Sequence, residues 1–305
     1  MTERHTGMAV VGYVVLALGV LFAIGPLYLT ICAASAPNEQ LLNHGAAFLP
    51  GGRLLDNVAA VARRMDLPRM LFNSFLVSSV VVAGKLALSS ITAYAVVFFR
   101  APIRNFIFWS ILATLLLPLE VRIIPTYAIA SDLFEPLKTL LQITGLDSVI
   151  SSLAGISIIP TVNLLDTYTG LSLPLVASAT GTFLFRQFYL TVPTELVDAA
   201  RIDGAGPIRF FFDILLPLSK TNFAALGTIV FISTWKDYMW PLVVTDQASM
   251  RTITLAVSSF LPTDTSQLPE WNLVMAAALI AIIPPIIVIA VMQRWFTRGL
   301  IGVGK

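Results

Sequence analysis

The sequence predicts an all-α polytopic membrane protein, and three observations support this fold class. Hydrophobic residues make up 57% of the 305 positions and charged residues only 12%, against roughly 25% charged residues in an ordinary soluble domain. The mean hydropathy is +0.85. The apolar runs lack the alternation of β-barrel strands, and a helix satisfies its own backbone hydrogen bonds inside lipid.

Six apolar runs are long enough to cross a bilayer, because about 20 helical residues span a hydrocarbon core of ~30 Å. The first run exceeds the roughly 7–15 apolar residues of a signal peptide, so it is predicted to be a retained helix. We find no internal repeat and no linker, and therefore expect one permease domain over residues 1–305. The predicted spans are 8–34, 71–99, 105–130, 168–190, 221–246 and 271–293.

The orientation follows from the short loops that are rich in arginine. With the N-terminus inside the cell, Arg100 and Arg104 of a short turn and Arg294 and Arg298 of the tail are cytoplasmic. The long loop 35–70 also holds four arginines, but it holds three acidic residues as well, and long loops orient a chain more weakly. We expect both termini to be cytoplasmic.

Residues 131–167 interrupt the pattern of spans. Their second half is apolar, but a glycine, a proline and an asparagine break it, and it is short for a seventh span. We expect this stretch to be an external excursion, either amphipathic or re-entrant.

The stretch 193–217, "PTELVDAARIDGAGPIRFFFDILLP", stands out for its charges and glycines. Thr194 is expected to cap a helix of about ten residues that Gly204 terminates, and Pro207 to open a second short helix. Helices this short are marginal alone, so a partner should dock on them. Two other interpretations are an interfacial helix pair with phenylalanines 210–212 among lipid headgroups, and, less favoured, a DNA-binding helix-turn-helix.

The segment "ELVDAARIDGAGPIRFFFDILLPL" resembles the coupling loop of importer permeases of the ATP-binding-cassette type, in the carbohydrate branch with six spans. Asp198 replaces a more usual glutamate, and Thr221 stands where a proline often follows. The resemblance covers most of the chain and implies the type I importer permease fold, with a cytosolic coupling helix between spans 4 and 5. The matching positions are Glu195, Ala199, Ala200, Gly204, Leu216 and Pro217.

The resemblance also implies an assembly. It consists of a second permease subunit forming a heterodimer with this chain, two copies of a cytosolic ATPase, and an extracytoplasmic solute-binding protein, in the inner membrane of a bacterium. ATP and Mg would be bound by the ATPases; we expect no cofactor, metal or nucleic acid on this chain, which has no G-x-x-x-x-G-K-[ST] loop. The residues implied in ATPase coupling are Glu195, Asp198, Ala199, Ala200, Asp203, Gly204 and Pro217.

Three cations near the apolar runs are candidates for the substrate path: Lys85, Arg122 and Lys236. A charge at the bilayer centre costs at least about 2.5 kcal/mol, so Lys85 should face protein or water. A substrate that bears phosphate would favour such positions. The alternative is local pairing, Arg122 with Glu120 and Lys236 with Asp237, together with snorkelling near the span ends.

The predicted function is a permease subunit of an ATP-driven importer rather than an enzyme. The resemblance implies glycerol-3-phosphate, or a glycerophosphodiester such as glycerophosphocholine, as substrate; a neutral sugar is the alternative. An ion-driven transporter would need buried acids and an inverted repeat, and neither is clear. A membrane enzyme has little support, because the chain has only two histidines and neither H-E-x-x-H nor G-x-S-x-G.

Overall fold

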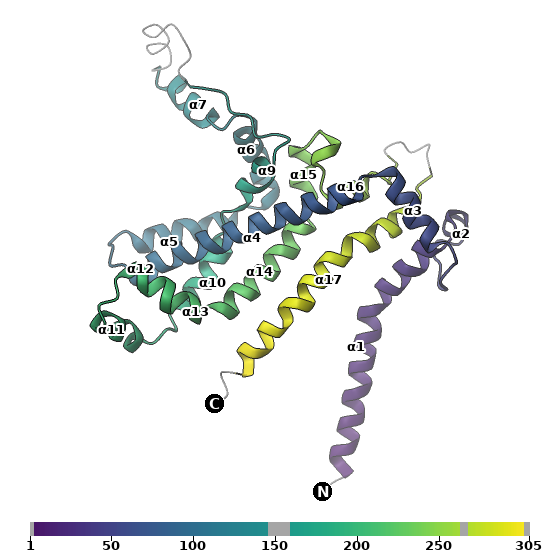
Figure 1. The fold of residues 1–305 in the computed structure, drawn as a ribbon, viewed down its shortest axis with the longest axis horizontal. Coiled ribbons are helices and arrows are strands. Elements are labelled where there is room, and N and C mark those ends of the chain that lie inside the picture. Colours follow the sequence, from purple (N-terminus) through teal and green to yellow (C-terminus); the bar gives the residue numbers. More distant parts are fainter. Residues whose placement is uncertain (1–2, 146–158, 263–267, 302–305) are drawn as a thin grey trace. The chain divides into compact units, whose positions relative to one another are not determined.

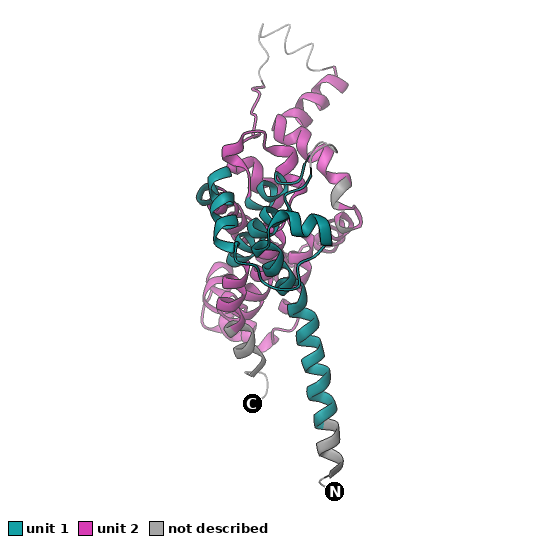
Figure 2. Ribbon diagram, turned by 90° about the vertical axis from the view of Figure 1, so that its right-hand side faces the viewer, with its two compact units in different colours: residues 1–69, 253–284 teal, residues 70–252, 285–305 magenta. Residues whose placement is uncertain are grey.

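The computed structural model describes residues 3–145, 159–262 and 268–301, and within them helices are the only regular elements (Figure 1). The predicted all-α class is thereby confirmed. The chain divides into two compact units: Met1–Arg69 with Ile253–Pro284, and Met70–Thr252 with Pro285–Lys305 (Figure 2). One permease domain over 1–305 stays a prediction.

Unit 1 contains the long N-terminal helix and three short ones. At the end of α1, Gly51 donates its N–H to the Ser35 hydroxyl over 2.8 Å, and Cys32 is fully buried in a small core. Along the apolar part of α1, by contrast, the most hydropathic window has no buried residue. The helices are α1 (Glu3–Ser35), α2 (Asn38–His44), α3 (Leu54–Arg64), α16 (Ile253–Ser258) and the first half of α17 (Trp271–Ile301).

Unit 2 contains the rest of the chain. Its core is aromatic and aliphatic, and Phe185, Tyr189 and Leu215 are almost fully buried there. The main helices are α4 (Leu67–Phe98), α5 (Arg104–Ala113), α6 (Leu119–Ser131), α7 (Glu135–Ile143), α9 (Tyr168–Ser172), α10 (Ala179–Tyr189), α11 (Thr194–Ile202), α14 (Lys220–Trp235) and α15 (Met239–Val244). Shorter turns are η1 (Thr114–Leu116), η2 (Leu173–Leu175), α12 (Pro207–Arg209), the π-helix η3 (Phe210–Leu215), α13 (Leu216–Leu218) and η4 (Ala248–Met250).

Three of the six predicted spans are single helices. In the described part of the chain, the helices long and apolar enough to cross a bilayer cover Ala9–Ser35, Leu67–Phe98 and Trp271–Gln293. A fourth exists if Pro207–Leu218 and Lys220–Trp235, which meet at 73°, form one bent span. The predicted spans 105–130, 168–190 and 221–246 are instead each divided between two shorter helices.

Proline explains where these three spans break. It has no N–H to donate and its ring clashes with the preceding turn, so a helix stops before it and restarts with proline near its beginning. Pro118 is the N-cap of α6, Pro174 lies in the first turn of η2, and Pro241 lies in the first turn of α15. Broken backbone at membrane depth is tolerated where it faces protein or lines a cavity.

Close approach of α4 and α10 depends on a glycine. A Cβ atom added at Gly181 would lie 2.4 Å from the Ser89 hydroxyl oxygen and 3.0 Å from the Ser89 Cβ. The first distance is shorter than a side chain tolerates, and the second is a tight contact. Gly181 therefore sets the spacing of these two helices.

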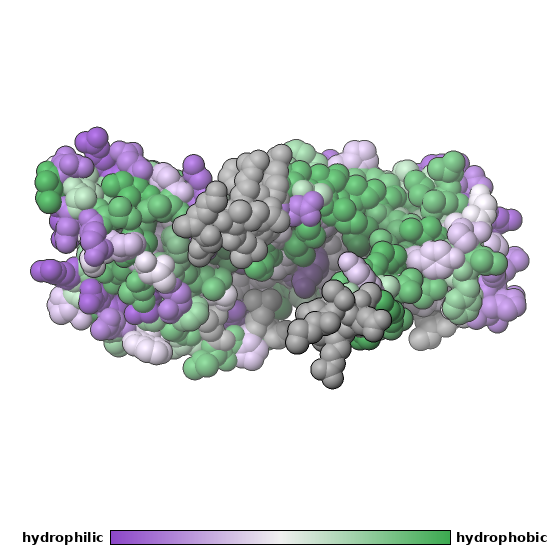
Figure 3. All heavy atoms as spheres, turned by 90° about the horizontal axis from the view of Figure 1, so that it is seen from below, coloured by the Kyte–Doolittle hydropathy of each residue, from purple (hydrophilic) through white to green (hydrophobic). Residues whose placement is uncertain are grey.

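Large apolar side chains cover much of the described surface. Phe22 is 87% exposed, Leu116 83% and Ile124 78%. Hydrophobic residues form broad patches on the face shown in Figure 3. A soluble monomer rarely shows patches of this extent, so this surface is suited to lipid or to other apolar helices.

Backbone hydrogen bonds join the two ends of the excursion that follows α6. Leu133 donates its N–H to the Val162 carbonyl over 3.0 Å, and Leu164 donates to the Ala130 carbonyl over 2.8 Å. Asp132 forms an ion pair with Lys138, and the hydrogen bond from Lys138 lowers the pKa of the Asp132 carboxyl. Much of the apolar second half of the excursion lies outside the described residues.

Candidate functional site

The predicted coupling segment begins with α11, a helix of nine residues. Pro193 is its N-cap, with an extended backbone (φ −57°, ψ 136°), and Thr194 is already the first helical residue. The expectation that Thr194 caps this helix is therefore wrong. The fixed φ of proline supplies the entry that a capping side chain would otherwise stabilise.

The end of α11 matches the prediction. Gly204 has φ +74°, a left-handed conformation that glycine adopts without strain. Ala205 donates its N–H to the Ala200 carbonyl over 2.8 Å, and Gly204 donates to the Arg201 carbonyl over 3.1 Å. These two bonds form a Schellman motif, which ends the helix sharply and fixes the direction of the chain that follows.

The acidic residues of α11 lie on its outer side. Glu195, Asp198 and Asp203 are exposed, and Asp198 forms an exposed ion pair with Arg201 at 3.3 Å. Of the two alanines, Ala199 is exposed, whereas Ala200 is only 4% exposed and packs in the core of unit 2. The helix thus has an acidic outer surface and an inner face that is held by the unit.

An aromatic cluster joins this segment to α4. The Tyr94 hydroxyl donates to the Pro207 carbonyl over 2.9 Å, and its ring centroid lies 5.1 Å from that of Phe211. The Phe98 and Phe210 centroids are 5.4 Å apart. Phe210 and Phe211 are buried whereas Phe212 is 59% exposed, so two of the three phenylalanines pack inside the protein rather than among headgroups.

Pro217 lies in α13 and is exposed, just before the sharp bend that leads into α14. The chain turns by 73° between the two helical segments on either side of Ser219. The coupling segment therefore leaves the axis of α14 at a steep angle. It lies at one end of unit 2, with α6, α9 and α15 toward the other (Figure 1).

The second part of the candidate site is a cavity of about 610 Å³ inside unit 2. Residues of α4, α5, α6, α10 and α15 line it, together with Thr114 and Leu117 before α6 and residues between α9 and α10, among them Pro174. Lys85 and Arg122 both line the cavity, and Lys236 does not. Two of the three cations on the predicted substrate path are thus brought together.

Lys85 lies near the middle of α4, where the segment before α10 packs closely against this helix. A Cβ at the preceding residue, Gly84, would come within 2.6 Å of the Val176 side chain, so Gly84 lets the segment before α10 pack closely against α4. Lys85 interacts electrostatically with Asp237 and Arg122. Hydrogen bonds from the backbone at the start of α15 reach Asp237.

Arg122 and Lys236 differ in their surroundings. The Nε atom of Arg122 is buried and has no hydrogen-bond partner among the described residues. Lys236 is exposed, and the expected pairing with Asp237 is absent from the ion pairs of the described residues. The Glu120 side chain, expected to pair with Arg122, lies outside the described part.

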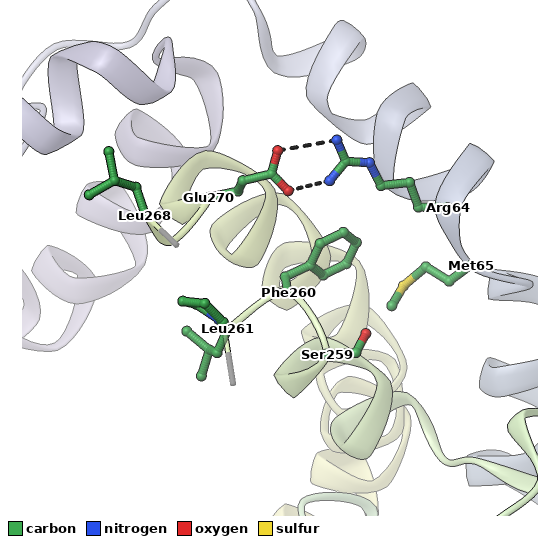
Figure 4. Close-up of a pocket in the computed structure, with 8 residues that line it drawn as sticks. Arg64, Met65, Ser259, Phe260, Leu261, Leu268 and Glu270 are labelled. Carbon is green, nitrogen blue, oxygen red and sulfur yellow. Dashed lines mark hydrogen bonds and ion pairs between the residues drawn. The ribbon is translucent and has the colours of Figure 1, made fainter. Parts of the chain in front are cut away.

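An ion pair that the sequence reading missed lies in unit 1 (Figure 4). Arg64, at the end of α3, donates hydrogen bonds from both Nη atoms to the Glu270 carboxylate, and its Nη2 lies 3.1 Å from Glu270 Oε1. This hydrogen bond raises the pKa of Arg64. A cavity of about 300 Å³ adjoins it. Both side chains are well exposed, so the pair contributes only about 0.2–1 kcal/mol to stability.

The sequence indicated the cations Lys85 and Arg122 as candidates for the substrate path, but it could not show that they line the same cavity. Trp240 is only 3% exposed, lines the cavity and donates from its ring nitrogen to the Gly170 carbonyl over 3.2 Å. Its neighbour Pro241, in the first turn of α15, is the residue of the sequence that could have indicated a break at this place.

Comparison with known proteins bears on both parts of the site. Residues 85–302 match the family described as "Binding-protein-dependent transport system inner membrane component". The matched range includes the cavity cations and the coupling segment.

Curated relatives match over the full length. The chain is 44% identical to the sn-glycerol-3-phosphate transport system permease protein UgpE of Brucella melitensis over 312 aligned residues, covering 100% of both chains. It is 43% identical to the protein of the same name from Yersinia pestis over 311 residues, again covering 100% of both.

A solved structure shares the fold. It is a chain of a bacterial ATP-binding-cassette transporter involved in the import of the acidic polysaccharide alginate. The TM-score is 0.71 with 19% sequence identity, over 97% of this chain and 99% of that one. At this identity the likeness concerns the fold.

Proposed function

The chain belongs to the family of binding-protein-dependent transport system inner membrane components, and from this premise we propose that it carries sn-glycerol-3-phosphate inward across a bacterial inner membrane. It is a permease subunit of an ATP-binding-cassette importer, and ATP hydrolysis lies in a separate subunit. The observation that carries the choice of substrate is the 43–44% identity, over the whole length, to permeases named for this compound.

The coupling segment is the part of the chain that receives the motion of the ATPase. Glu195, Asp198, Ala199 and Asp203 form its contact surface, since all four are exposed. The acids suit basic groups on the partner, because complementary charges orient an interface. Ala200, Gly204 and Pro217 hold the shape of the segment through packing, the left-handed turn and the bend before α14.

Movement of this segment is passed to α4 through the aromatic cluster. Tyr94 and Phe98 of α4 pack on Phe210 and Phe211, and buried aromatic contacts move as one body because a packed interior is not continuously deformable. The same helix carries Lys85 into the cavity. A shift of the segment toward α4 therefore alters the cavity, as alternating access requires.

The assembly follows the type I importer plan. This chain pairs with a second permease subunit as a heterodimer, two ATPase copies bind ATP and Mg on the cytosolic side, and a solute-binding protein docks outside. Both termini and α11 face the cytoplasm, consistent with the arginines of the short loops. The exposed apolar α1 is suited to the bilayer.

Uptake by cells tests the substrate. Labelled sn-glycerol-3-phosphate, glycerophosphocholine and a neutral disaccharide are offered to cells that lack this chain and to cells complemented with it. We expect chain-dependent uptake of the phosphate-bearing compounds, with sn-glycerol-3-phosphate preferred. Chain-dependent uptake of the disaccharide alone would overturn the proposal.

A further inference from the structure

We propose that the cavity of unit 2 is a phosphate-binding site, in which Lys85 and Arg122 hold the phosphate of the passing substrate. This inference rests on the proposed function and deepens it, because it assigns recognition of the charged group to residues of this chain. The cavity of about 610 Å³ is large enough for a small phosphorylated polyol, and both cations line it.

The first argument is the position of the cations. Lys85 lies near the middle of a 32-residue helix that is apolar enough to cross the bilayer. Arg122 follows the proline break at the start of α6. A charge at the position of Lys85 is costly in a bilayer, and where such a charge occurs it marks the path of an ion or of a charged substrate.

The second argument is the balance of charge among the described side chains. Lys85 lies within electrostatic range of the Asp237 carboxylate and of the Arg122 guanidinium. Neither cation takes part in the ion pairs of the described residues, and Arg122 Nε is buried without an acceptor there. A guest anion would balance the excess positive charge and give this nitrogen its acceptor.

The third argument is the supply of further donors. Thr92, Thr126 and Thr180, each with a hydroxyl donor, are among the residues that line the cavity. The first turn of α10 also faces it through Ala179 and Thr180, and the N–H groups of a first turn lack acceptors within the helix. These donors add to the two cations in a lining that is otherwise largely apolar.

The chemistry points to a phosphate ester on a small polyol. The planar guanidinium of Arg122 matches two phosphate oxygens, whereas the Lys85 ammonium acts as a point charge. The apolar lining leaves room for a short carbon chain. A neutral sugar would bring no negative charge to the two cations, and recognition of phosphate here would therefore disfavour it.

Lys236 provides a matched control, because it is a cation of the same region that is exposed and outside the cavity. The importer is reconstituted in proteoliposomes with its ATPases, partner permease and binding protein, and uptake of sn-glycerol-3-phosphate is measured. We expect Lys85→Met and Arg122→Met to lower uptake about tenfold or more, as for the loss of a charge-assisted hydrogen bond. We expect Lys236→Met to remain within about twofold of the unsubstituted importer, as for a surface change.

The outcomes separate the site from the proposed function. If the unsubstituted importer does not take up sn-glycerol-3-phosphate, the proposed function fails. The phosphate site is wrong, while the function stands, if the unsubstituted importer takes up sn-glycerol-3-phosphate and both cavity variants transport it at the same rate. The same holds if Lys236→Met lowers uptake as much as the two cavity variants do.

A second measurement covers variants that fail to assemble. Arg122→Lys keeps the positive charge but loses the planar guanidinium that can bind two oxygens at once. We therefore expect an assembled complex with partial uptake. In the unsubstituted complex without binding protein, sn-glycerol-3-phosphate should raise the melting temperature, and glycerol at the same concentration should not. Equal effects of the two compounds would contradict the site.

Discussion

At the residue scale, the end of α11 depends on the absence of a side chain at position 204. Gly204 has φ +74°, where a residue with a side chain costs about 1–2 kcal/mol. We expect Gly204→Val to misdirect the coupling segment, so that transport per ATP hydrolysed falls by about 5- to 30-fold while the protein still inserts. Uptake and ATPase activity measured on the same proteoliposomes check this.

Gly206 is the matched control for this change. It lies two residues on with φ −69° and ψ 169°, a conformation open to any residue, and a Cβ at either position would meet nothing within 4 Å. Gly206→Val should therefore leave coupling nearly unchanged. Equal coupling in both variants would show that the left-handed turn has no role.

Residue-level chemistry was partly readable from the sequence. Lys85 could be picked out because its charge conflicts with its apolar neighbours, and Gly204 because of its place after a short helix. Periodicity could not show that Arg122 reaches the same cavity and Lys236 does not. That difference depends on where three broken helices restart, which is a tertiary property.

At the element scale, the spacing of α4 and α10 makes a second prediction. Gly181→Ala would place a methyl group 2.4 Å from the Ser89 hydroxyl oxygen, and overpacking of this kind costs about 1–3 kcal/mol. We expect a lower melting temperature for the purified protein. Ser89→Ala should restore part of it in the double variant, since it removes the nearer of the two clashing atoms.

The remaining tight contact with the Ser89 Cβ, at 3.0 Å, is the reason for expecting partial rather than full recovery. Ser90→Ala is the control, because Ser90 is the next residue of α4 and its hydroxyl bonds to Ala87 of the same helix. If Ser90→Ala rescued Gly181→Ala as well as Ser89→Ala does, the contact would not be the cause.

The base of the excursion gives a pH-dependent prediction. Asp132 bonds to Lys138 and to the N–H groups of Phe134 and Val162, and its pKa is lowered, chiefly by Lys138. A lowered folded-state pKa means that this stabilisation is complete above the unfolded value of ~3.9 and is lost as pH falls through the folded value below it.

Hydrogen exchange of α7, corrected for the intrinsic rate at each pH, measures this loss. We expect constant protection from pH 7 to about 5, and loss at pH values below about 4. Asp132→Asn should lower protection already at neutral pH and remove the acid transition. Asp203→Asn, on the exposed side of α11, should change neither the protection of α7 at neutral pH nor its acid transition. If the acid transition survived in Asp132→Asn, another group would be its cause.

Helix existence was predictable at this scale, but helix continuity was not. The spans near 8–34, 71–99 and 271–293 are single helices, although α17 contains Pro284 and Pro285. The spans 105–130, 168–190 and 221–246 are broken. Hydropathy reports only that a stretch prefers lipid or protein to water, whereas a proline breaks a helix where the neighbouring elements can accept the freed backbone groups.

At the scale of the whole molecule, cysteine labelling can test the orientation, because the one native cysteine is shielded from reagents. Cys32 is the only cysteine, and it is fully buried. Ile202 of α11 is 86% exposed and Leu55 of α3 is 80% exposed. Single substitutions at these positions therefore report on the coupling segment and on the loop 35–70 separately.

We expect an impermeant maleimide to label Leu55→Cys only in right-side-out spheroplasts, and Ile202→Cys only in inside-out vesicles stripped of ATPase. The reason is that short loops rich in arginine stay in the cytoplasm while the long loop is translocated. Adding the ATPase back should slow labelling of Ile202→Cys and leave Leu55→Cys unaffected, because the motor is proposed to cover α11. The unsubstituted protein should stay unlabelled on both sides. Labelling of Ile202→Cys from outside would place the coupling segment beyond the reach of any cytosolic ATPase and would refute the proposed mechanism.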